Sequence, residues 1–86
     1  MRPYRLVACT FHDELEAWAT LRQSCEIVYR NSEEEVQTII SKIMDVYAEN
    51  RADYILIQDG TVIRLDSLLS VNGKPIQFAS SLSSGA

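Results

Sequence analysis

The sequence has few of the residues from which small proteins build covalent frameworks. It contains two cysteines, three glycines, two prolines and one histidine among 86 residues. Cys9 and Cys25 are too few for the dense disulfide framework of a secreted mini-protein. The N-terminal residues MRPYRLVACT are basic, but the apolar run that a signal peptide requires does not follow them. No apolar run in the sequence reaches the roughly 20 residues of a membrane span. These absences predict a reduced, cytoplasmic protein with no membrane contact.

Residue sets for catalysis and cofactor binding are also missing. The single histidine has no serine or cysteine motif beside it, and the glycines are too scattered for a phosphate-binding loop. Cys9, His12 and Cys25 could supply three metal ligands, whereas a structural zinc site takes four. Carboxylates such as Asp13 and Glu16 are more typical of a solvated or partner-facing helix surface than of a catalytic pair. We therefore expect no enzyme activity, no metal and no cofactor.

Basic residues are too few and too scattered for a general nucleic-acid binder. The chain has 8 Lys+Arg against 12 Asp+Glu and a formal charge of -4. Eleven of the acids, but only four of the bases, fall between Asp13 and Asp59. Such a surface repels RNA and favours a basic partner, although simple solvation of these carboxylates is an equally open interpretation. The tyrosines are spread out and do not predict a platform for RNA bases: Tyr4, Tyr29, Tyr47 and Tyr54.

The clearest element is an amphipathic helix near the start of the chain. Phe11, Leu15 and Trp18 recur at helical spacing and form one apolar stripe. The opposite face carries the polar residues Asp13, Glu16 and Thr20, with Glu14 on its flank. The helix is therefore expected to present an acidic surface to solvent or to a partner.

Two capping patterns compete for the start of this helix. Thr10 with Asp13 has the S/T-x-x-D pattern, and Asp13 with Glu16 has the corresponding acid-x-x-Glu pattern. Either pattern places Asp13 and Glu16 near the positive end of the helix, where carboxylates are stabilised.

Strand patterns follow the helix. Residues 25–30 alternate as a strand does, and Asn31-Ser32 follows as a turn before an acidic run. The segment DYILIQDG (53–60) predicts a strand that ends in an Asp-Gly turn, and TVIRL (61–65) is its return. These residues predict a β-meander.

The last part of the chain holds another turn and a tail. Asn72-Gly73 predicts a turn before a short strand, and Pro75 confines that strand to a sheet edge or to its first residue. Residues 79–86 (ASSLSSGA) are low in complexity and predict a flexible, serine-rich tail. Residues 1–78 are expected to form a single domain.

The segment 36–47 fits two structures. Its apolar residues recur at helical spacing, which by itself favours a helix. Its first part, VQTIISKI (36–43), is rich in β-branched residues, which favours a strand. The rest of the pattern is one helix followed by about five strands, so the fold class is mainly β with one helix. A curved sheet of this size, capped by a helix, is typical of a small barrel.

Several short motifs, spaced along most of the chain, together resemble a known family. They are Tyr4, Cys9, His12-Asp13-Glu14-Leu15-Glu16, Asp45-Val46, Asp53-Tyr54-Ile55 and Ile63-Arg64-Leu65-Asp66. Their order and spacing, from about residue 4 to residue 72, are similar to those of the Rof (YaeO) family of Rho-binding antiterminators. The motifs are individually short, and it is their joint occurrence that is specific.

This resemblance implies a fold and a function. The fold is an Sm-like barrel with an N-terminal helix, in which residues 36–43 form the second strand and lead to a short turn at Asp45. The function is to bind the N-terminal RNA-binding region of Rho, the hexameric termination helicase, and to block its primary RNA site. Such a protein acts as a monomer and binds no nucleic acid directly. The alternative is an Sm-like module that binds RNA directly or within a ribonucleoprotein.

The resemblance also assigns candidate contact residues on the helix. Asp13 and Glu16 stand at the family's helix acids, and Glu14 stands at the polar position between them. His12 occupies a position where tyrosine is more usual in the family. With the outward-facing Thr20, the residues expected to bind Rho are His12, Asp13, Glu14, Glu16 and Thr20. Their carboxylates can compete electrostatically for a surface that otherwise binds RNA phosphates.

Overall fold

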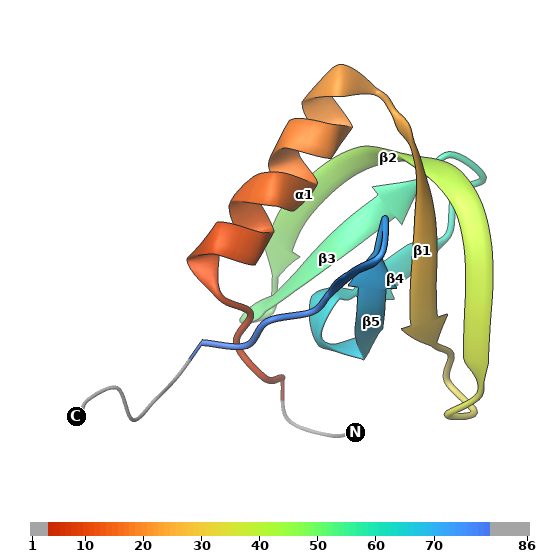
Figure 1. The fold of residues 1–86 in the computed structure, drawn as a ribbon. Coiled ribbons are helices and arrows are strands. Elements are labelled where there is room, and N and C mark those ends of the chain that lie inside the picture. The colour runs from red at the N-terminus through yellow and green to blue at the C-terminus, as the bar shows by residue number, and fades with distance from the viewer. Residues whose placement is uncertain (1–3, 80–86) are drawn as a thin grey trace.

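The computed structural model describes residues 4–79 and has one α-helix packed against a strongly curved antiparallel sheet of six strands (Figure 1). The prediction of a mainly β protein with one helix is confirmed. In chain order the elements are α1 (Cys9–Leu21), β1 (Ser24–Arg30), β2 (Val36–Glu49), β3 (Ala52–Ile57), β4 (Val62–Arg64), the 3-10 helix η1 (Leu65–Ser67), β5 (Leu68–Val71) and β6 (Lys74–Pro75). The strand order in the sheet is β4-β3-β2-β1-β5-β6, which places Pro75 on an edge strand as expected.

Strand β2 is longer than expected and bends. Residues 36–42 pair with β1, and residues 43–49 pair with β3. The strand predicted at 36–43 is therefore confirmed, but the turn predicted at Asp45 is wrong. Ile43 pairs with Ile57 and Asp45 pairs with Leu56, so that one extra residue bulges out of the ladder between them. Such a bulge bends a strand without ending it, and one strand can then serve both halves of the sheet.

Two short turns fix the register of the hairpins. Asn50 and Arg51 join β2 to β3 and both have positive φ, at 53° and 66°. Asn72 and Gly73 join β5 to β6 and have φ angles of 54° and 78°. The turn predicted at this Asn-Gly pair is therefore confirmed. Left-handed conformations at both central residues match the twist of the paired strands.

The hairpin of β3 and β4 is confirmed, with shorter strands than expected. Asp59-Gly60 lies in the turn, and Gly60 has a φ of 94°, a conformation that glycine adopts without strain. The return strand ends at Arg64. Leu65, the predicted end of this strand, lies with Asp66 in η1 instead, because the chain turns there to reach β5.

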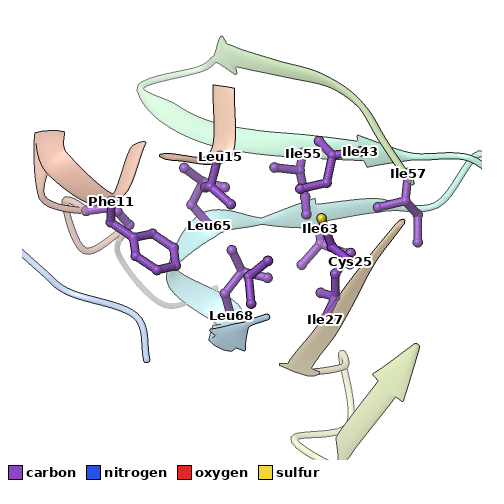
Figure 2. Packing of buried hydrophobic residues seen from close by; sticks show 12 residues of the cluster. Phe11, Leu15, Cys25, Ile27, Ile43, Ile55, Ile57, Ile63, Leu65 and Leu68 are labelled. Atoms are coloured by element: carbon purple, nitrogen blue, oxygen red, sulfur yellow. The ribbon is translucent and has the colours of Figure 1, made fainter. Parts of the chain in front are cut away.

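The interior is formed by one cluster of apolar side chains from the helix and all but the last strand (Figure 2). Phe11 and Leu15 enter it from α1, and Leu15 is completely buried. The other members are Val7, Cys25, Ile27, Ile43, Ile55, Ile57, Ile63, Leu65, Leu68 and Val71. Trp18 packs against this cluster at its margin. The apolar stripe predicted for the helix therefore faces the core.

Both capping patterns predicted for α1 are wrong. The helix begins at Cys9, its N-cap is Ala8, and no side chain caps it. The carbonyl of Ala8 accepts hydrogen bonds from the N–H groups of Phe11 (3.1 Å) and His12 (3.0 Å). Asp13 consequently lies beyond the first helical turn. Tertiary contacts determine this start, because the N–H of Ala8 itself donates to the carbonyl of Gln77 at 2.8 Å.

The segment before α1 pairs with the segment that follows β6. Val7 and Phe78 form an antiparallel bridge, and the N–H of Ala79 donates to the carbonyl of Leu6 at 2.9 Å. The rest of the predicted tail, residues 80–86, lies outside the described residues. The 13-residue α1 is well short of a membrane-crossing helix, and residues 4–79 contain no other candidate.

Replacing Leu15 by alanine should lower the free energy of unfolding by about 3 kcal/mol, because it leaves a cavity between α1 and the sheet. Chemical denaturation of the purified variant measures the change. The matched control is Leu21→Ala, the same substitution at a residue of α1 that is 64% exposed. It should change stability by less than about 0.5 kcal/mol. Equal losses in the two variants would contradict the packing described for Leu15.

Candidate protein-binding face

Helix α1 separates its acidic residues from its apolar ones. Asp13, Glu16 and Thr20 are exposed on the outer face, opposite the buried Phe11 and Leu15, as the helical wheel predicted. The carboxylates are therefore available to a partner, and the apolar side of the same helix holds it to the sheet.

The other two predicted contact residues, His12 and Glu14, are half-buried and each contacts a polar side chain. His12 Nδ1 lies 3.2 Å from Glu16 Oε2, one helical turn away. Glu14 Oε1 lies 3.0 Å from Lys74 Nζ on β6, so this carboxylate links α1 to the edge of the sheet. Asp13 has no ion-pair partner within residues 4–79. Of the predicted set, Asp13 thus presents its charge most freely to a partner.

An open hollow adjoins the acidic face where the second half of α1 crosses β2. Its volume is about 480 Å³. It is lined by Glu16, Ala19, Thr20, Arg22, Met44, Asp45 and Val46. Asp45 is the residue that sequence reasoning left unassigned, because it was expected in a turn. Asp45 instead follows the bulge in β2 and lines the same hollow as Glu16 and Thr20.

A larger hollow of about 650 Å³ lies elsewhere, between the turn after β1 and strand β4. Its charged residues are of both signs, Arg30 and Arg64 with Glu34. Arg64 is already bound by Asp66. This hollow has no group of side chains suited to catalysis, so its size alone does not make it the functional site.

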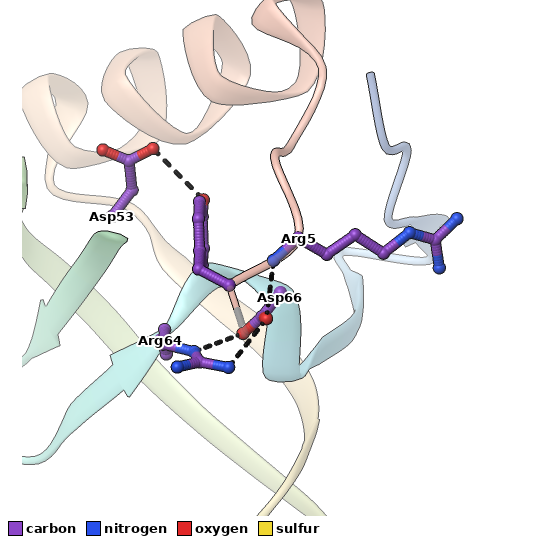
Figure 3. Close-up of polar contacts among 5 residues, drawn as sticks. Arg5, Asp53, Arg64 and Asp66 are labelled. Carbon is purple, nitrogen blue, oxygen red and sulfur yellow. Dashed lines mark hydrogen bonds and ion pairs between the residues drawn. The ribbon is translucent and has the colours of Figure 1, made fainter. Parts of the chain in front are cut away.

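Four residues from the motifs named above, Tyr4, Asp53, Arg64 and Asp66, lie in polar contacts around the segment that precedes α1 (Figure 3). The hydroxyl of Tyr4 donates to Asp53 Oδ2 at 3.1 Å. The guanidinium of Arg64 donates to both oxygens of Asp66, at 2.7 and 2.9 Å. Asp66 also accepts the backbone N–H of Arg5 at 3.0 Å. The network therefore ties the segment before α1 to β3, β4 and η1.

Burial decides the properties of this network. The side chain of Asp66 is only 3% exposed and that of Arg64 is 16% exposed, so each charge needs the other. Burial, followed by the nearby carboxylate of Asp53, raises the pKa of Tyr4 above its usual range. The guanidinium of Arg64 also lies near the ring of Tyr4, 5.6 Å from its centroid. These groups are structural, since they hold the base of α1 in place.

The two cysteines do not create a metal site with His12. Cys9 is exposed at the start of α1, whereas Cys25 is buried in β1. No group of three or more potential ligands among residues 4–79 is arranged to hold a metal ion.

Comparisons with known proteins add no assignment. The chain matches no family model, no curated protein and no solved structure.

Removing the charge of Asp66 should destabilise the protein. Asp66→Asn leaves the partly buried guanidinium of Arg64 without its counter-ion, and we expect a loss of about 2 kcal/mol in the free energy of unfolding. Urea denaturation gives this value. Asp13→Asn is the control, because it neutralises an exposed aspartate and should change stability by less than about 0.5 kcal/mol. An unaffected Asp66→Asn protein would show that the ion pair contributes nothing.

The phenol of Tyr4 should make stability fall at alkaline pH. Its pKa is higher in the folded protein than in the unfolded chain, where it is about 10. The stabilisation is therefore complete below pH 10 and is lost as the pH rises further. Tyr4→Phe should cost about 1 kcal/mol at pH 7 through the lost hydrogen bond, yet weaken the decline between about pH 10 and 11.5. Urea midpoints across this range test it, and an unchanged slope in the variant would contradict the assignment.

Proposed function

We propose that this protein inhibits Rho-dependent transcription termination by binding the N-terminal RNA-binding region of Rho and blocking its primary RNA site. It acts as a monomeric binding protein rather than an enzyme. The acidic outer face of α1 is the contact surface, with Asp13 and Glu16 at its centre. Carboxylates there compete with RNA phosphates for the basic groups of Rho.

The observation that carries this proposal is the exposure of Asp13 and Glu16 on a helix that is anchored by its other face. Leu15 and Phe11 fix the orientation of α1, so that the carboxylates are held in place before a partner arrives. A preorganised surface loses less conformational entropy on binding than a flexible one. The positions of these acids are also those at which the chain resembles the Rof family.

The polar network supports the family resemblance on which this proposal rests. The network joins residues from motifs that are far apart in the chain and that resemble those of Rof. These residues contact one another or a shared segment, and they are Tyr4, Asp53, Arg64 and Asp66. A common structural role explains why such motifs would occur together. We also propose that the curved sheet is Sm-like, since β1 lies between β2 and β5 and the helix precedes the first strand.

Charge reversal on α1 tests the proposed contact. The double variant Asp13→Arg/Glu16→Arg should bind an isolated Rho N-terminal domain at least tenfold more weakly, because two attractive charges become repulsive. Its stability should stay within about 1 kcal/mol of the parent protein, since both side chains are exposed. Isothermal titration calorimetry measures binding, and chemical denaturation measures stability.

The matched control is Glu33→Arg/Glu35→Arg, which makes the same change of charge in the exposed turn between β1 and β2. It should retain most of the affinity, with a small loss from the altered net charge. Affinity of the parent protein should fall as salt rises, because exposed charges are screened. Equal effects of the two double variants would show that α1 is not the interface.

Direct RNA binding is the outcome that would favour the alternative function. A gel-shift assay with single-stranded RNA and the parent protein alone distinguishes the two. We expect no shift at protein concentrations that saturate the Rho domain. A tight complex with RNA in the absence of Rho would identify an Sm-like RNA-binding module instead.

A further inference from the structure

Two tyrosines form a stacked pair on the sheet. The rings of Tyr47 and Tyr54 have centroids 5.5 Å apart and planes inclined by 24°. They are cross-strand partners in β2 and β3. These two tyrosines, which are spread out in the sequence, therefore lie together in the structure. The turn at Asn50-Arg51 is the reason, because residues equally distant from a two-residue turn lie opposite one another.

The pair lies on the outer face of the sheet. Val46 precedes Tyr47, and Ile55 follows Tyr54. These two neighbours are paired with each other across the strands, and both pack into the core. Successive side chains of a strand point to opposite faces, so the two tyrosines point away from the core. Both are partly exposed, which leaves ring surface accessible to a partner.

Carboxylates flank the pair on the same face. Asp45 and Glu49 lie two residues before and two residues after Tyr47, and both are exposed. Neither forms an ion pair with another residue between 4 and 79. The pKa of Tyr47 is raised, chiefly by burial. The charge of Glu49, the neighbouring Tyr54 and the charge of Asp45 raise it further. Two carboxylates thus lie near the ring of Tyr47.

Of the two arginines near the pair, Arg64 is paired within the protein. Arg64 is the cross-strand partner of Tyr54 on β4, and both oxygens of Asp66 bind its guanidinium. Arg51 lies in the turn close to Glu49, and these two residues form no ion pair with each other. The surface therefore keeps two carboxylates available to an incoming cation.

We propose that Tyr47, Tyr54, Asp45 and Glu49 form a docking surface for an arginine side chain of a basic protein partner. The planar guanidinium stacks on a tyrosine ring while its N–H groups donate to a flanking carboxylate. A nucleic-acid base could stack on the same rings, but its phosphates would meet those carboxylates. Charge complementarity therefore favours a basic polypeptide.

The location of this surface connects it with α1. Asp45 lines the hollow that also contains Glu16 and Thr20. A partner that covers the acidic face of α1 can therefore extend across the hollow to the tyrosines. For the identity of the partner this inference rests on the proposed function, and it adds a second part to the same interface.

The test compares a ring-deleting variant with charge variants in two assays. Tyr47→Leu removes the aromatic ring and keeps an apolar strand residue. We expect it to weaken binding to the Rho N-terminal domain about threefold to fivefold, as for loss of one exposed cation–π contact. Glu49→Gln should weaken binding about twofold. Its matched control, Glu33→Gln in the turn between β1 and β2, should leave affinity unchanged.

The second assay requires no Rho. A short peptide of alternating arginine and glycine is titrated into the parent protein, and the ring resonances of the tyrosines are followed by NMR. We expect the resonances of Tyr47 and Tyr54 to move, and to move less with the corresponding lysine peptide or with Glu49→Gln. The Glu49→Gln variant keeps the test decisive if Tyr47→Leu fails to fold.

The outcomes separate this inference from the proposed function. If Rho does not bind but the arginine peptide moves the two rings, the proposed function fails and the docking surface stands. If Rho binds Tyr47→Leu and Glu49→Gln as tightly as the parent protein, the docking surface is overturned. Equal responses to arginine and lysine peptides, or ring shifts with oligocytidine RNA instead, would also overturn it.

Discussion

The bend in β2 is the constraint on which the other features depend. Because this strand continues through residues 43–45 with an extra residue, its first half pairs with β1 and its second half with β3. The sheet consequently curves around a single core, and α1 lies against the concave region near the bend (Figure 1). Asp45, directly after the bulge, lines the hollow beside α1. A straight β2 would separate the two surfaces discussed above.

The molecule divides its charged groups between two tasks. Asp66 and Arg64 are largely shielded from water and satisfy each other, so their effect is to position the chain. The carboxylates of Asp13, Glu16 and Glu49 are exposed, and the contact of Glu16 with His12 contributes little stability at such an exposed position. The outer surface can therefore tolerate changes of charge that the inner network cannot. In physical terms, partner preference can change while the fold is retained.

Local patterns allowed much of the fold to be predicted from the sequence. The helix, the strand at 25–30 and the Asp-Gly and Asn-Gly turns follow from periodicity and turn chemistry. The length of β2 did not, because β-branched and helical signals coincide over 36–47 and no residue type marks a bulge. The start of α1 was missed because Gln77, at the far end of the described chain, determines it. The stacking of Tyr47 on Tyr54 was not predicted, because the Asn50-Arg51 turn that pairs them has no strong sequence signature.

The pairing of the two terminal segments has a consequence for synthesis on the ribosome. Helix α1 is made before the strands that it packs against, yet its N-cap is fixed by Gln77, and the adjacent bridge requires Phe78. During vectorial synthesis the helix can form early, but its orientation is set only after the last strands have emerged. The surface that carries Asp13 and Glu16 is therefore among the last parts of the molecule to reach its final position. An incomplete chain would display these acids on a helix that is not yet anchored.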